Sequence, residues 1–321
     1  MSSINKPLIT VVGALSKQGR SVVRSLLESQ RYEVWALTRR VDSPEAQELA
    51  SLGAHLIQAP LEIGHKTEFI KAFKGAHGVF MMTPGIPPEA PHARTHETEL
   101  GKEIADAAVE AGVQHLVFST LENVEKITDG KKWVPHFTDK ARVEEYIRTL
   151  PINSSFISMA FFYTNLLEYY PPYQQGETLI FSIYLPEDFR APFVDPLTAT
   201  GPAVLEIFDH QEKYSGCWLP VVGEIISPKE MVETFTRVTG IKAQYRPAIT
   251  REELLHHFPS YSGMEGLTAE IVGMAEYAFE NGYYREDRDV QWSRKVNPSA
   301  LTWAQFLQTT GWKGEGHTFG V

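Results

Sequence analysis

The sequence predicts an α/β protein built on a doubly wound parallel sheet, followed by a smaller α+β lobe. The apolar run from Leu8 to Val12 leads through a glycine-containing loop into a segment whose apolar residues recur with helical spacing. Strand-like and helix-like segments then alternate through the first half of the chain, as in a parallel sheet. The run from Gly78 to Pro84 is almost continuously apolar, which is typical of a strand buried on both faces. We expect a sheet domain over residues 1–155 and a smaller lobe over residues 156–321, parts of which return to the sheet.

Local signals place the other elements. Ser43 and Pro44 are a preferred helix start and Gly53 a preferred helix end. In the smaller lobe, Ser227 and Thr250 each precede a glutamate by three residues, which predicts two capped helix starts. The remaining expected elements are strands over 33–38, 54–59, 114–120, 155–160 and 178–184, and helices over 66–73, 97–111 and from within 133–140 to 150.

The loop after the first strand, residues 13–19, has the context that holds a phosphate. Gly13 at the turn lets backbone approach a pyrophosphate, and Gly19 at the helix start allows close packing of helix on strand. The helix N-terminus adds unpaired N–H groups and a positive dipole end. Ser16 takes the middle glycine position of a G-x-x-G-x-x-G spacing. The alternative is an ordinary strand-to-helix turn that contains two glycines.

The end of the second strand indicates which dinucleotide the loop holds. Arg39 and Arg40 lie roughly 20 residues after Gly19, where a fold that binds NAD places an acid for the ribose hydroxyls. A guanidinium there suits a 2′-phosphate, so we expect NADP(H), with Arg39 as its contact. The alternative for Arg39 is a solvated surface charge.

Composition limits the partners. The net charge is −10, and the lysines and arginines are scattered, which argues against direct binding of nucleic acid or an anionic membrane. The residues from Met1 to Pro7 lack the apolar stretch of a secretory signal, and no apolar run approaches ~20 residues. We expect a soluble, cytoplasmic protein, with a nuclear location left open.

One short stretch has the spacing of a metal site on a helix. His92 and His96 are four residues apart with Glu97 beside them, but no third ligand is identifiable and the glutamate is misplaced for a metalloprotease. The single cysteine, Cys217, excludes a cysteine-built metal cage. We expect no metal.

Taken together, these stretches resemble the NmrA-like family, atypical members of the extended short-chain dehydrogenase/reductase superfamily. The matching pieces are residues 12–23, 37–39, 116–124, 136–146, 165–167 and 297–302. The resemblance implies a Rossmann-type domain that binds NADP(H), with the nicotinamide near Thr83, Lys140 and the segment 162–165. The residues expected to bind the cofactor are Gly13, Ala14, Ser16, Gln18, Gly19, Arg39, Thr83, Lys140, Phe162 and Asn165.

Compared with ordinary short-chain dehydrogenases, this chain lacks the tyrosine that serves them as proton donor. Ordinary short-chain dehydrogenases have Tyr-x-x-x-Lys where this chain has His136-x-x-x-Lys140. Lys140 can stabilise the oxyanion left by hydride transfer, or it can hydrogen-bond only the cofactor ribose. His136, of a residue type whose unperturbed pKa is near neutrality, is a candidate proton relay, and Tyr163 is a third candidate donor. The alternatives are a helix-start residue without chemistry for His136 and a packed aromatic for Tyr163.

Two functions stay open at this point. One is an NADPH-dependent reductase of an activated small-molecule acceptor, an enone, quinone or carbonyl. The other is a non-catalytic NADP(H) redox sensor that regulates a partner protein. The aromatic residues of the segment 161–173 suit either a substrate pocket or a hinge between lobes. A homodimer is left open.

Overall fold

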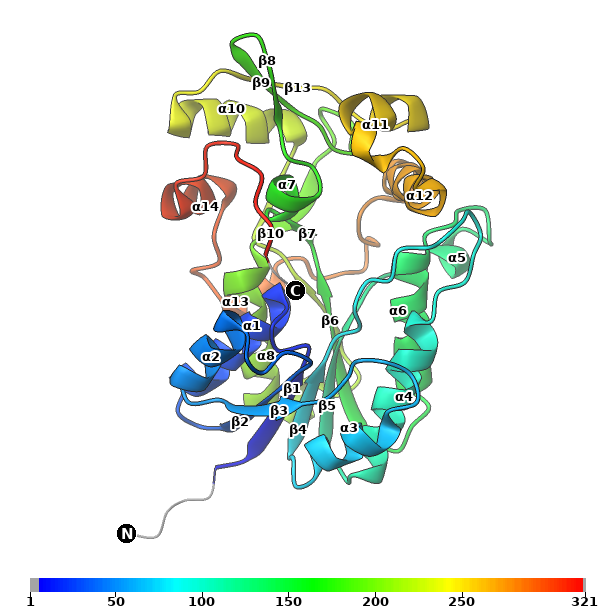
Figure 1. The fold of residues 1–321 in the computed structure, drawn as a ribbon, viewed down its shortest axis with the longest axis vertical. Helices are drawn as coiled ribbons and strands as arrows, with labels where there is room; N and C mark the ends of the chain where they lie inside the picture. Colours follow the sequence, from blue (N-terminus) through cyan, green and yellow to red (C-terminus); the bar gives the residue numbers. More distant parts are fainter. Residues whose placement is uncertain (1–5, 320–321) are drawn as a thin grey trace.

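Residues 6–319 are described by the computed structural model, and within them seven parallel strands form the central sheet (Figure 1). In sheet order these strands are β11 (Trp218–Val221), β6 (Asn153–Met159), β5 (His115–Thr120), β4 (Gly78–Met81), β1 (Leu8–Val12), β2 (Glu33–Thr38) and β3 (His55–Gln58). Their parallel register confirms the predicted doubly wound sheet.

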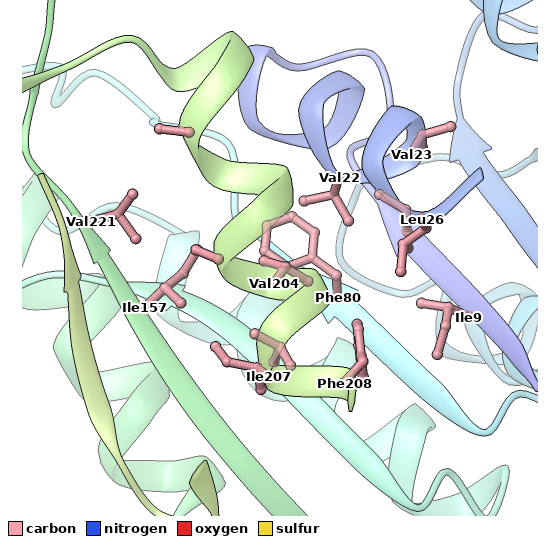
Figure 2. Close-up of a cluster of buried hydrophobic side chains, with 14 of the residues drawn as sticks. Ile9, Val22, Val23, Leu26, Phe80, Ile157, Val204, Ile207, Phe208 and Val221 are labelled. Carbon is pink, nitrogen blue, oxygen red and sulfur yellow. The ribbon is translucent and has the colours of Figure 1, made fainter. Parts of the chain in front are cut away.

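Helices cover both faces of this sheet (Figure 1). One face packs against α1 (Lys17–Glu28), α2 (Pro44–Ser51) and α8 (Pro196–Asp209). The other face packs against α3 (Lys66–Phe73), α4 (Glu97–Glu110) and α6 (Pro135–Ile147). Figure 2 shows how side chains of α1 and α8 interdigitate over the sheet strands.

The contact between α1 and α8 is close because Gly201 faces α1 without a side chain. A Cβ at Gly201 would lie 2.1 Å from the Ser21 carbonyl oxygen, and the Gly201 N–H donates to Ser21 Oγ at 2.9 Å. The second half of the chain therefore contributes to the sheet domain. β6 crosses the boundary expected at residue 155, and α8 and β11 join the sheet domain from beyond it.

The C-terminal lobe lies beyond the carboxyl ends of the strands (Figure 1). Within the described residues it contains two small sheets, β12 (Glu224–Ile226), β10 (Ala191–Val194) and β7 (Phe161–Phe162), and β13 (Ala243–Tyr245), β9 (Thr178–Phe181) and β8 (Tyr173–Gln175). Its longer helices are α10 (Pro228–Thr239), α12 (Glu265–Asn281), α14 (Trp303–Thr310) and α11 (Arg251–His257). The lobe also contains the short helix α7 (Asn165–Glu168) and the 3-10 turn Pro259–Tyr261, while the short helices α5 (Val124–Ile127), α9 (Gln211–Tyr214) and α13 (Trp292–Val296) pack on the sheet domain. An aromatic-rich core holds the lobe together.

No helix between residues 6 and 319 is both long and apolar enough to cross a membrane. The first five residues, part of the segment expected to lack a secretory signal, lie outside the described residues.

Candidate cofactor and reaction site

The glycine loop connects β1 to α1 in a conformation that needs both glycines. Gly13 has φ +70°, and a Cβ there would lie 2.8 Å from Met82 Sδ. A Cβ at Gly19 would lie 2.2 Å from the Gly13 carbonyl oxygen and 2.8 Å from Ala14 Cα. Helix α1 therefore starts directly against the loop backbone, the close approach that a pyrophosphate cradle requires. A side chain at Gly13 or Gly19 would occupy the space that this close approach requires.

Ser16 explains how the loop works without a middle glycine. It is the N-cap of α1, and its Oγ accepts from the Gly19 N–H at 3.0 Å. A serine N-cap satisfies one of the unpaired N–H groups at the start of a helix. Serine in place of the middle glycine therefore stabilises the start of α1. Gln18 follows on the first turn, where Ser119 Oγ at the end of β5 donates to its Oε1 at 2.8 Å.

Arg39 lies at the same end of the sheet as this loop. Leu37 pairs with Val12 in register, and the Ala14 N–H donates to the Leu37 carbonyl at 3.2 Å. Two residues further on, Arg39 is exposed to solvent. The guanidinium is therefore free to move toward a 2′-phosphate on a dinucleotide seated at the loop.

Lys140 is the centre of a buried polar group. Its Nζ forms an ion pair with the Glu97 carboxylate and hydrogen-bonds the carbonyl and Oγ1 of Thr83, each at 3.3 Å. Thr83 Oγ1 donates to Glu97 Oε1 at 2.5 Å. The exposed fractions are 6 % for Lys140, 1 % for Glu97 and 0 % for Thr83, so bulk water screens this pair weakly. Because Thr83 follows β4, the neighbour of β1, the ammonium lies at the same end of the sheet as the loop.

His136 lies four residues before Lys140 in the first turn of α6, and its ring lies against Gly85. The pKa of His136 is lowered to about 3, mainly by burial and also by the charge of Lys140. The imidazole is therefore neutral around pH 7. The unperturbed pKa that made His136 a candidate relay therefore does not apply at this position, and its role as a proton relay stays a prediction.

Tyr163 has the surroundings of a core residue. Its side chain is 0 % exposed and packs on Phe193, Trp303 and Phe306 of the C-terminal lobe. Its hydroxyl has no hydrogen-bond partner among the described residues. Burial raises the pKa of Tyr163 well above its ordinary value. The packing favours the alternative of a structural aromatic, and its role as a proton donor stays a prediction.

The segment expected beside the nicotinamide does face the glycine loop. Lys17 Nζ, on the first turn of α1, pairs with Glu168 at 2.5 Å and lies 6.0 Å from the centre of the Phe162 ring. Asn165 begins the short helix α7 that carries Glu168. The Phe319 ring lies 5.0 Å from the same ammonium. Lys17 thus joins the two lobes beside the loop, a contact that the sequence analysis missed.

Two further carboxyl groups of the site were also missed. Glu97 entered the sequence analysis only as a neighbour of His96, and its partner lies 43 positions away. Glu270, on α12, accepts from the His136 N–H at 2.6 Å across 134 positions. Pairings over such distances leave no local periodicity.

The two histidines considered as metal ligands have other surroundings. His92 packs its ring on Trp133, with the ring centres 5.4 Å apart, and His96 is the N-cap of α4. Between residues 6 and 319, no group of three or more His, Cys, Asp or Glu side chains is arranged to hold a metal.

Comparisons with known proteins agree with this fold. A family model described as the NmrA-like family matches residues 5–307. An NmrA-like family domain-containing protein of Dictyostelium discoideum is 32 % identical over 247 residues, covering 74 % of this chain and 79 % of that protein. The NmrA-like family domain-containing oxidoreductase notA of Aspergillus sp. (strain MF297-2) is 32 % identical over 303 residues, covering 88 % and 86 %. The crystal structure of NmrA, a negative transcriptional regulator, in complex with NADP has a TM-score of 0.73 at 23 % identity, covers 94 % of each chain and shows the same fold.

Proposed function

The chain belongs to the NmrA-like family, and we propose that it is an NADPH-dependent reductase of an activated small-molecule acceptor. The observation that carries the proposal is the convergence at one end of the sheet of a glycine cradle, an exposed arginine after β2 and a buried lysine of α6 that bonds Thr83 after β4. Relatives described as oxidoreductases support it.

The residues present fit NADP(H). Gly13, Ser16 and Gly19 would hold the pyrophosphate at the N-terminus of α1, and Arg39 would hold the 2′-phosphate. Bound NADPH would supply a hydride. The positive charge of Lys140 would then stabilise negative charge that develops on the acceptor oxygen. Quinones, enones and carbonyls are acceptors of this kind.

One experiment tests the proposal. Purified protein is mixed with NADPH and a panel of quinones, enones and aromatic carbonyls, and NADPH oxidation is followed by absorbance. Acceptor-dependent oxidation that saturates with acceptor supports a reductase. No oxidation with any acceptor, although NADPH binds, contradicts it.

A non-catalytic NADP(H) sensor that regulates a partner protein is the second candidate. It is favoured by the contact between lobes at the loop, where Lys17 pairs with Glu168 and the Phe319 carbonyl accepts from Arg20 Nη2 at 2.9 Å. A cofactor at this place would act on both lobes, and a ligand can shift an equilibrium only through differential affinity for its states. A sensor should show different oligomer mass or protease sensitivity with NADPH and with NADP⁺, and no turnover.

Cofactor choice gives a further prediction. Wild-type protein should bind NADP(H) more tightly than NAD(H), by roughly 1–3 kcal/mol if one charge-assisted contact dominates. Arg39→Ala should remove most of this difference, measured by calorimetric titration. Arg31→Ala is the matched control, because Arg31 precedes β2, is exposed and pairs with Asp209 at 2.6 Å. Equal affinity of the wild type for both dinucleotides would rule the assignment out.

A further inference from the structure

Glu270 belongs to the C-terminal lobe, yet its carboxylate lies against the start of α6. It is 4 % exposed, and its Oε1 accepts from the His136 N–H at 2.6 Å. His136 and Lys140 lie one turn apart on α6. The carboxyl group therefore reaches the part of α6 that carries the reactive lysine.

The packing of α12 holds this carboxyl group in place. Gly266, Glu270 and Gly273 share one face of the helix by their spacing. A Cβ at Gly266 would lie 2.1 Å from the Pro88 carbonyl oxygen, and one at Gly273 would lie 2.5 Å from the Trp133 carbonyl oxygen. The backbone of α12 thus rests on the loop after β4 on one side and on the chain entering α6 on the other. Glu270 lies between these two glycines on the helix, and its side chain extends to the His136 backbone N–H.

Several charged and titratable groups act on Glu270 from the elements around it. They are Glu97 of α4, His136, Asp139 and Lys140 of α6, and Tyr170 and Tyr184 of the C-terminal lobe. The pKa of Glu270 is raised to about 7, mainly by burial and also by the carboxylates of Glu97 and Asp139. The His136 N–H and the charge of Lys140 act in the opposite direction. Near pH 7 a substantial fraction of the protein therefore carries a proton on this carboxyl group.

The other candidate donors of the site are less suited to give up a proton to an acceptor. The three N–H hydrogens of Lys140 have three acceptors, the Glu97 carboxylate and two oxygens of Thr83. The Tyr163 hydroxyl is enclosed in the aromatic core. The His136 imidazole is neutral at pH 7, so it does not carry the extra proton that it would have to donate.

We propose that Glu270 is the proton donor of the reaction, in place of the tyrosine that the His136-x-x-x-Lys140 stretch lacks. The inference rests on the proposed reductase function. When the acceptor carbon of a ketone gains the hydride, the electron pair of the C=O bond moves to oxygen, and that oxygen takes the proton of Glu270. The carboxylate regains a proton from water before the next turnover. Only the protonated carboxyl can donate, so turnover should fall as pH rises through about 7.

The choice of acceptor separates this role from a structural one. An aromatic ketone needs both a hydride and a proton, whereas a preformed N-alkyl iminium ion of the same ring system needs only a hydride and yields a neutral amine. Glu270→Gln should lower kcat/KM for the ketone by about 100-fold, the scale of losing a general acid. It should leave kcat/KM for the iminium ion unchanged. The loss of ketone turnover above pH 7 should be present in the wild type and absent in Glu270→Gln.

Two variants complete the experiment. Glu276→Gln is the matched control, because Glu276 lies on the same helix, is half exposed and pairs with Lys132; it should behave as wild type with both acceptors. Glu270→Asp keeps a carboxyl group and should keep the pH dependence at reduced turnover; it decides the matter if the amide variant does not fold. Equal losses with ketone and iminium ion, or a pH dependence that survives in Glu270→Gln, would overturn the assignment. A wild type that reduces neither acceptor would instead overturn the reductase function, and the inference with it.

Discussion

Gly19→Val should abolish NADPH binding. Even a Cβ at this position would lie 2.2 Å from the Gly13 carbonyl oxygen, so the valine must push α1 away from the loop that it closes. That displacement moves the N–H groups of the helix start away from the pyrophosphate and spoils the N-cap bond from Gly19 to Ser16 Oγ. Calorimetric titration with NADPH measures the loss, after circular dichroism has shown that the variant is folded.

A second glycine variant separates lost binding from lost stability. Gly75 has φ +78° in the turn before β4, and a Cβ there would meet no atom within 4 Å. Gly75→Ala strains the backbone without touching the loop, so it should lower the melting temperature and leave NADPH affinity unchanged. If folded Gly19→Val is stabilised by NADPH as strongly as the wild type, the cofactor binds elsewhere.

Elements with local signals were predicted well from the sequence. The strand over 33–38 and the helix over 66–73 have the expected bounds, because apolar pattern and flanking residues agree there. The capped starts at Ser227 and Thr250 are both observed with the reciprocal hydrogen bonds of a capping box. Such bonds join residues three positions apart, so the sequence alone contains the information.

The polar centre of the site depends on contacts that no local pattern contains. Lys140 was predicted, but its partner Glu97 was not, because only the packing of α4 on α6 brings them together. Glu270 carried a weak signal: a glutamate between Gly266 and Gly273 on one face of a helix indicates close backbone packing around a carboxyl group. What that face packs against could not be read from spacing. The same limit explains His136, whose pKa is set by burial.

The last prediction concerns Lys140 and has to account for its buried partner. Lys140→Met alone removes the cation from a Glu97 carboxylate that is 1 % exposed, which should destabilise the protein by about 3–5 kcal/mol. The double variant Lys140→Met with Glu97→Gln removes both charges, and the amide oxygen can still accept from Thr83 Oγ1. It should therefore recover most of the lost stability, as measured by thermal unfolding.

Turnover should not recover with it. If the charge of Lys140 stabilises the developing oxyanion, both Lys140→Met and the double variant should lose a factor of about 100 or more in kcat. Glu97→Gln alone keeps the ammonium and should lose far less. If Lys140 only holds the cofactor ribose, the double variant should instead show a raised KM for NADPH with kcat near that of the wild type. That outcome would remove Lys140 from the reaction while leaving its place in the cofactor site intact.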